Sequence, residues 1–255
     1  MMHYASARTQ DRIVAAPLYD SDTERLQVYI LSDFTDVAGG GRIGVDVGWT
    51  WYDFDGHALS SPRHEVVTMS GLDARLVYDV STRPSDAHFD AATRGGYLHV
   101  VVAFDLDGIP PPPPPGDDDQ RPRRHRHRRA NEHFLSPASL RHAPLRDPGL
   151  GITPIPPAPP DDGWRFDVHC AGPGVAAWVS VEHPDDVVGY FAEILAGATQ
   201  EVPSIGFWMR PGETRRLRFQ MASRSSPSSS SQRPPPAVPW WERVKVRSMW
   251  DSMAS

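Results

Sequence analysis

The sequence predicts an all-β fold built from two β-sandwich domains in tandem. Apolar residues fall in short segments that alternate with polar ones, the period of two expected of a strand with one face in a core. Glycine, proline and aspartate separate these segments at short intervals, as in sandwich proteins. The 255 residues, with 39% hydrophobic residues and 27 prolines, suit two small cores joined by polar connectors, because domains commonly hold roughly 100 to 150 residues.

The first predicted domain covers residues 13–145. It opens with a hairpin, in which the apolar segments 13–19 and 26–31 pair across a turn at Asp20–Thr23. Further strands are expected at 43–54, 66–69 and 97–104. The last of these is apolar enough to be a central strand of its sheet.

The second predicted domain covers residues 146–255. Its clearest strand is 214–221, in which Leu217, Phe219 and Met221 alternate with Arg216, Arg218 and Gln220. One face of this strand is therefore expected in a core and the other in water. The remaining strands are expected at 164–168, 174–182, 187–191, 206–209 and 243–249.

Low-complexity segments interrupt both predicted domains. Residues 109–130 begin with six successive prolines at 110–115, which cannot donate to a strand ladder and favour an extended polyproline helix. The serine- and proline-rich segment 223–239 has too few apolar residues to offset the entropy of ordering. Both segments are predicted to be disordered insertions, and residues 154–160 are predicted to be a further connector.

The basic run Arg121–Arg129 has two interpretations. It could be a nuclear address or a tether for nucleic acid, since it concentrates arginine. It also lies beside the acidic triplet 117–119 and between two strands of one predicted sandwich, which favours a solvated insertion. His125 and His127 stand among these arginines, where repulsion opposes the binding of a metal cation.

Charge and cysteine content exclude several functional classes. The net charge is −6 with a pI near 6.0, so no overall basic surface favours nucleic acid. Cys170 is the only cysteine and is expected to be a small core residue in a reducing compartment.

The first residues lack the charged and apolar regions of a signal peptide, and no segment reaches the ~18 apolar residues of a membrane helix. The chain as written is expected to be soluble, away from membranes and cytoplasmic.

The eight tryptophans could serve a core or a sugar-binding platform. Trp49, Trp51 and Trp178 lie within apolar strand segments and are expected in the core. Trp208, Trp240, Trp241 and Trp250 flank turns, and they are expected either to cover an end of a sandwich or to face another domain. A platform on which sugar rings stack remains open for this second group.

Several short motifs of the second domain carry a resemblance to a known family. They are Val175–Trp178, His183-Pro184, Gly189–Phe191, Gly206–Trp208, Pro211–Thr214 and Val244–Asp251. Together they resemble the C-terminal immunoglobulin-like domain of the β-mannosidases of glycoside hydrolase family 2. Motifs upstream of these resemble the sandwich that precedes this domain in these enzymes: Pro17–Asp20, Ser32-Asp33, Trp51–Gly56, Asn131–Phe134 and Asp147–Gly149.

The resemblance implies two immunoglobulin-like sandwiches from the accessory region of an enzyme that hydrolyses terminal non-reducing β-D-mannose residues of β-mannosides. The family's catalytic (β/α)8 barrel would be missing from this chain and would be its partner in the same polypeptide. Residues 1–12 would be a remnant of the last barrel helix, or else a leader. β-Mannoside oligosaccharides would then be bound by the parent enzyme.

No catalytic, cofactor-binding or metal-binding residue is assigned from the sequence. Asn131-Glu132 imitates the Asn-Glu pair that carries the acid/base in the family, but the matching place in the family is a strand of the accessory sandwich. Glu132 is therefore expected to be structural, and the chain alone is expected to be inactive. The sequence shows no glycine-rich phosphate loop, metal quartet or Gly-x-Ser-x-Gly elbow. The alternative function is a free-standing carbohydrate-binding or protein-interaction module.

Overall fold

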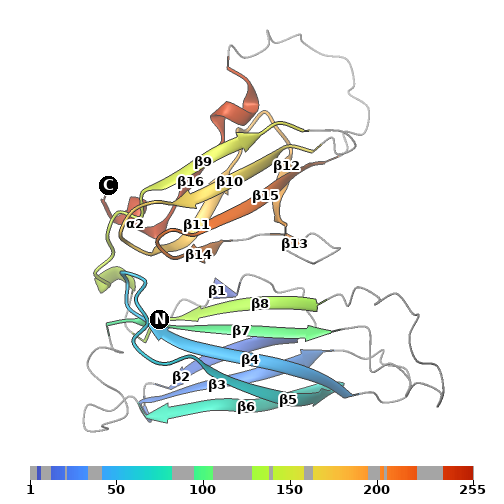
Figure 1. The fold of residues 1–255 in the computed structure, drawn as a ribbon, viewed down its shortest axis with the longest axis vertical. Helices are drawn as coiled ribbons and strands as arrows, with labels where there is room; N and C mark the ends of the chain where they lie inside the picture. The colour runs from blue at the N-terminus through green and yellow to red at the C-terminus, as the bar shows by residue number, and fades with distance from the viewer. Residues whose placement is uncertain are drawn as a thin grey trace, which may run out of the picture. The chain divides into compact units, whose positions relative to one another are not determined.

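The computed structural model describes residues 5–6, 13–20, 22–33, 42–81, 95–105, 128–137, 140–157, 163–194, 202–203, 206–222 and 238–254. The chain divides into two compact units with a boundary between Pro144 and Leu145. Strands make up most of both units (Figure 1). In the described residues every strand pairing is antiparallel. The all-β fold predicted from the sequence is confirmed.

The first unit contains a five-stranded and a three-stranded sheet. The five-stranded sheet has the order β1 (Ala5–Ser6), β8 (Arg128–Leu135), β7 (Tyr97–Asp105), β4 (Arg42–Tyr52) and β5 (Arg63–Ser70). The three-stranded sheet has the order β2 (Ile13–Asp20), β3 (Arg25–Asp33) and β6 (Leu72–Ser81). Strand β7 lies between β8 and β4, as its apolar sequence predicts, and β2 pairs with β3 as the expected hairpin.

Alternation along the strands creates the core of the first unit. In β3, Leu26, Val28 and Ile30 are buried, whereas Arg25 and Leu31 point the other way and are exposed. Apolar residues of β4 and β7 join those of β2 and β3 in one buried cluster, so the two sheets share a core. Removal of this apolar surface from water, at about 25 cal/mol per Å², is the main force that holds the sheets together.

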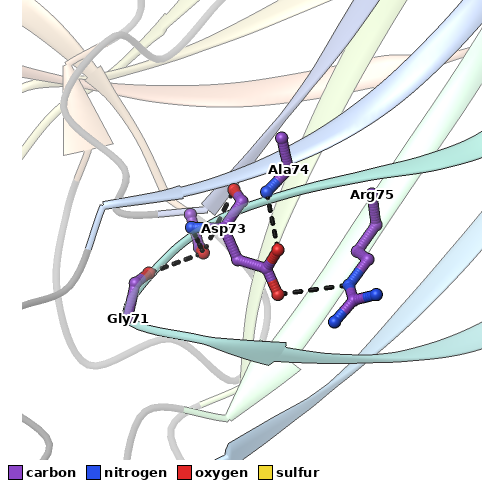
Figure 2. A network of polar contacts seen from close by, with 5 residues as sticks. Gly71, Asp73, Ala74 and Arg75 are labelled. Atoms are coloured by element: carbon purple, nitrogen blue, oxygen red, sulfur yellow. Dashed lines mark hydrogen bonds and ion pairs between the residues drawn. The ribbon is translucent and has the colours of Figure 1, made fainter.

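A sharp corner carries the chain from one sheet of the first unit to the other. Only Gly71 separates β5 from β6, and its φ of 53° is in the left-handed region that favours glycine. The Ser32 hydroxyl donates to the Gly71 carbonyl at 2.7 Å and accepts from the Asp73 amide at 3.1 Å (Figure 2). The Asp73 carboxylate in turn accepts from the Ala74 amide and from Arg75 Nε. The corner's polar groups are thus satisfied locally.

The second unit repeats the arrangement of a five-stranded and a three-stranded sheet. The larger sheet has the order β13 (Val202–Pro203), β12 (Gly189–Glu193), β15 (Thr214–Met221), β10 (Arg165–Cys170) and β9 (Leu150–Ile155). The smaller sheet has the order β14 (Phe207–Met209), β11 (Ala176–Glu182) and β16 (Lys245–Arg247). Buried residues from both sheets form one core, in which Leu217 and Phe219 of β15 lie as predicted. Met221 is exposed, contrary to the alternation.

Aromatic rings cover one side of this second core. The 3-10 helix η2 (Trp240–Arg243) places Trp241 in a stack on Trp164, with 4.2 Å between ring centroids. Trp240 lies 4.8 Å from the Phe219 ring and 6.0 Å from the Phe166 ring. Trp240 and Trp241 therefore cover the sandwich, which is one of the two roles expected for them.

The structure corrects the predicted boundaries of several elements. The strand expected at 243–249 is only Lys245–Arg247, because η2 precedes it and the helix α2 (Met249–Ala254) follows it. The connector expected at 154–160 begins as strand, since β9 runs to Ile155. Pro154 is tolerated there because β9 is an edge strand. The insertion expected at 109–130 ends earlier, because Arg128–Leu135 form β8.

The N-terminal segment also differs from its prediction. Within residues 1–12, which were expected to be a helix remnant or a leader, Ala5–Ser6 form β1 and pair with β8. Strands β6 and β9 and the short 3-10 helix η1 (Leu140–His142) were not predicted. The basic run up to His127, the proline run 110–115 and the serine-rich segment 223–237 lie outside the described residues.

Candidate functional site

Glu132, which stands in a catalytic-like Asn-Glu pair, lies within strand β8. Its direct partner across the sheet on β7 is Val101. A retaining glycosidase holds two carboxyl groups about 5 to 5.5 Å apart, whereas an aliphatic side chain occupies this neighbouring position. The half-buried Glu132 thus lies on a sheet, in the structural setting expected for it.

The residues on either side of Glu132 point into the core and bind the backbone of β2. Asn131 Nδ2 donates to the Ile13 carbonyl at 2.6 Å, and His133 Nε2 accepts from the Ala15 amide at 3.2 Å. Both side chains are buried. They supply hydrogen-bond partners to backbone groups on the edge of β2, where no strand pairs with it among the described residues. No sequence pattern indicates this role, since each partner lies 118 residues away.

Cys170 is buried in the second core, as predicted. Its thiol contacts the carbonyl oxygens of Pro148 and Gly174 at 3.4 and 3.5 Å. Burial raises the pKa of this thiol above its ordinary value. Because the thiolate is the reactive form of cysteine, a buried thiol with a raised pKa is a packing residue.

One group of side chains in the described residues could hold a metal ion. Ligand atoms of Asp53, Asp55 and His57 lie within 4.8 Å of one another. Asp53 Oδ1 already accepts hydrogen bonds from the amides of Asp55 and His57, at 2.9 and 2.8 Å, and so shapes the turn. Hard cations such as Ca²⁺ take six to eight oxygen ligands, which this group alone does not supply. Sequence reasoning found the Asp55-Gly56 turn but not the group, although Asp-x-Asp-Gly-His was its signal.

Two of the three tryptophans that were expected in the core are there. Trp51 is buried and its indole N–H donates to the Tyr78 hydroxyl at 3.1 Å. Trp49 is half-buried and packs against the same core. Trp208 was expected beside a turn, yet it is fully buried in β14.

Trp178 is not a core residue, and the prediction for it is wrong. Its side chain is 38% exposed, and its φ of 56° is in the left-handed region. Strand β11 has a bulge here, since Ala176 pairs with Met209 but Val179 pairs with Phe207. A bulge turns one side chain out of the alternation. Atoms of the indole ring lie 3.4 to 3.6 Å from a Cβ position at Gly206, so the ring packs against that glycine.

No helix among the described residues is long and apolar enough to cross a membrane. Three candidate groups thus have structural settings: Glu132 lies on a sheet, Cys170 in a core, and the Asp53 group in a turn. Trp178 stands apart as an exposed aromatic side chain on a strained backbone.

Comparison with known proteins finds similarity to β-mannosidases. Residues 145–252 match the family model of the mannosidase Ig-fold domain. Over 98% of its length the chain is 25% identical to β-mannosidase A of Aspergillus clavatus, and 23% identical to that of Aspergillus fumigatus. The chain is also 21% identical to β-mannosidase A of Emericella nidulans over its full length.

The chain spans only a small part of these relatives. It covers 22% of the Aspergillus clavatus protein and 23% of the Emericella nidulans protein. A solved β-D-mannosidase from Dictyoglomus thermophilum aligns with 93% of this chain and 21% of its own, at 11% identity and a TM-score of 0.48.

Proposed function

Since the chain resembles β-mannosidase A along nearly its whole length and residues 145–252 match the mannosidase Ig-fold domain, we propose that it is an accessory two-sandwich region of a β-mannosidase. The parent enzyme removes terminal β-D-mannose residues from β-mannosides. These sandwiches brace a catalytic (β/α)8 domain in the same polypeptide and do not carry the reaction.

One observation carries this proposal: nearly all of this chain is matched, yet the match uses only 22% of the relative. More than three quarters of the relative therefore lie elsewhere. A (β/α)8 barrel is built from eight parallel strands, whereas the strands described here pair in antiparallel fashion. The setting of Glu132 beside Val101 also supports a role without catalysis.

A chimera tests the proposed function. The matching region of Aspergillus clavatus β-mannosidase A is replaced by this chain, and the chimera is compared with the relative truncated before that region. We expect the chimera to unfold at a higher temperature and to hydrolyse an aryl β-mannoside faster than the truncated protein, because the sandwiches brace the catalytic domain. A chimera no better than the truncated protein in both measurements would overturn the proposal.

The exposed position of Trp178 favours a second candidate function, carbohydrate binding. One side of the indole packs against Gly206 and much of the ring remains accessible, which suits stacking on the apolar face of a sugar ring. Calorimetric titration of the chain with β-mannobiose would then show binding that Trp178→Ala abolishes and that Tyr190→Ala, at another exposed aromatic residue, leaves intact. Absence of binding to the unmodified chain would exclude this candidate.

A further inference from the structure

The outer face of the three-stranded sheet in the first unit is unusually apolar. Strands β2, β3 and β6 lie side by side in this sheet (Figure 1). Its inner face forms the core through residues such as Val28 and Ile30. We call the side chains on the opposite side the apolar outer face, and its main members are Leu18, Tyr29, Leu31, Leu72, Ala74 and Leu76.

The strand register shows that these side chains are neighbours. Tyr29 of β3 pairs with Ala16 of β2 on one side and with Leu76 of β6 on the other. Residues directly opposite each other in a sheet share a face, with about 5 Å between Cβ atoms. This row therefore joins all three strands.

The next rows extend the same surface. Leu31 pairs with Val14 and Ala74, and Leu72 follows on β6, opposite Asp33. The apolar side chains thus form one continuous surface and not a set of scattered residues.

These side chains are accessible to a partner. Leu72 is 77% exposed and Leu76 is 46% exposed. In an antiparallel sheet with one face on a core, the other face normally carries polar residues. The largest contiguous apolar patch on a soluble protein often serves as a contact surface for another protein or domain.

Polar groups border the patch at both ends. At one end Arg25 and Asp79 form an ion pair at 2.8 Å, next to the Asp20 turn. At the other end stands the exposed Asp33. An apolar centre with a polar rim is the usual composition of a protein interface.

The β2 edge of the sheet is a poorer place for a partner than its face. The β2 backbone at Ile13 and Ala15 is already bound by Asn131 and His133. An added strand would have to displace these side chains from backbone groups that they satisfy. The partner is therefore expected on the face, where apolar side chains offer the contact.

The size of the patch distinguishes a tethered partner from a second copy. Three strands about 4.8 Å apart, over four residues of strand length, give a footprint on the order of 200 Å². Stable complexes of separate proteins bury about 800 Å² on each partner, whereas contacts between domains of one chain can be smaller because the tether supplies a high effective concentration. The relatives hold more than three quarters of their length outside the matched region.

We propose that the apolar outer face is the surface through which the first sandwich docks onto the catalytic domain of the same polypeptide. This inference rests on the proposed function and names the face that performs it. The partner surface is expected to be apolar at its centre, because Leu31, Leu72 and Leu76 offer no hydrogen bonds from their side chains.

Carbene footprinting tests the docking face in the chimera described above. Labelling of Leu31, Leu72 and Leu76 should fall by about threefold or more relative to the isolated chain, since docked apolar residues are shielded from solvent. Val66 is the control, because it is 62% exposed but lies on β5 of the other sheet. Its labelling should stay the same.

A charge-introducing variant gives the second measurement. Leu31→Lys with Leu76→Lys should lower the unfolding temperature of the chimera to that of the truncated relative, and Val66→Lys should not. Neither variant should alter the unfolding temperature of the isolated chain, since these side chains already face solvent. If the double variant does destabilise the isolated chain, the carbene labelling of Leu31, Leu72 and Leu76 in the unmodified chimera tests the docking face instead.

The outcomes separate the two proposals. Equal labelling in a chimera that is still stabilised would overturn the docking face and leave the proposed function standing. A chimera without any gain would overturn both. Protection that depends on the concentration of the isolated chain, with a dimer in sedimentation, would assign the face to self-association, and protection by β-mannobiose alone would assign it to sugar. Each of these two results would overturn the inference.

Discussion

His133 Nε2 accepts a hydrogen bond from the backbone amide of Ala15 at 3.2 Å, across 118 residues of sequence. Because the amide is the donor, this nitrogen carries a lone pair, and the neutral ring holds its proton on Nδ1. Asn131 makes the matching contact to the Ile13 carbonyl from the same strand. Two side chains thus connect the two sheets of the first unit where backbone pairing does not.

Removal of this connection should destabilise the first unit. Asn131→Ala leaves the Ile13 carbonyl without its donor in a buried setting, and we expect a loss of about 1 to 3 kcal/mol in the free energy of unfolding. Glu132→Gln, on the opposite face of the same strand, should change it by less than about 0.5 kcal/mol. Urea unfolding followed by circular dichroism measures both. Equal losses would show that Asn131 has no special role.

Trp178 should behave unlike a core tryptophan. Trp178→Ala should cost less than about 2 kcal/mol because the ring is half exposed, whereas the buried Trp51→Ala should cost about 3 to 5 kcal/mol. Trp178→Gly should be at least as stable as Trp178→Ala, since a left-handed backbone costs roughly 1 kcal/mol or more with a Cβ atom. Thermal unfolding of these variants gives their order of stability. A Gly variant clearly weaker than the Ala variant would argue against the positive φ of Trp178.

The corner at Gly71 should be sensitive to a single methyl group. Gly71→Ala places a Cβ on a left-handed backbone and should cost about 1 to 2 kcal/mol. Ser32→Ala removes two hydrogen bonds to the same corner and should cost about 1 to 3 kcal/mol. Gly44→Ala is the matched control, because no atom lies within 4 Å of its Cβ position. A control as damaging as Gly71→Ala would contradict the conformational explanation.

The Asp167–Arg216 pair should make stability depend on acid pH. Arg216 donates two hydrogen bonds to the Asp167 carboxylate, at 2.7 and 2.8 Å, and these hold the pKa of Asp167 below its ordinary value. A lowered folded-state pKa stabilises the protein above the unfolded pKa of about 3.9, and the benefit disappears as pH falls through the folded value.

Asp167→Asn measures this contribution. The variant should be less stable than the unmodified chain at pH 7 by under about 1 kcal/mol, since Arg216 is half exposed and solvent screens the pair. The difference should shrink below about pH 4. Denaturant unfolding at several pH values follows it. A difference that grows in acid would reverse the assigned sign.

The isolated 255-residue chain should not hydrolyse an aryl β-mannoside. Catalysis of this type requires two carboxyl groups held in a pocket, and Glu132 faces Val101 across its sheet. Release of the aryl group by the chain and by Glu132→Gln is compared with the intact Aspergillus clavatus relative as a positive control. Turnover that is present in the chain and lost in Glu132→Gln would overturn the structural assignment of that residue.

Local patterns in the sequence determined the all-β class and most strands. The alternation in 214–221 predicts β15, and the hairpin of β2 and β3 follows from two apolar segments around an Asp-rich turn. The burial of Cys170 and Trp51 also follows from their strand context. These features depend on neighbours within a few residues, which a sequence displays directly.

Only the tertiary structure decided the features that depend on distant neighbours. The bulge that exposes Trp178 arises from the register between β11 and β14, and an apolar segment alone does not reveal one extra residue. Asn131 and His133 have a structural role because they form hydrogen bonds with backbone groups of β2. The apolar outer face appeared only when Leu31 met Ala74 and Tyr29 met Leu76 across the sheet, because strand order is set by the packing of the whole domain.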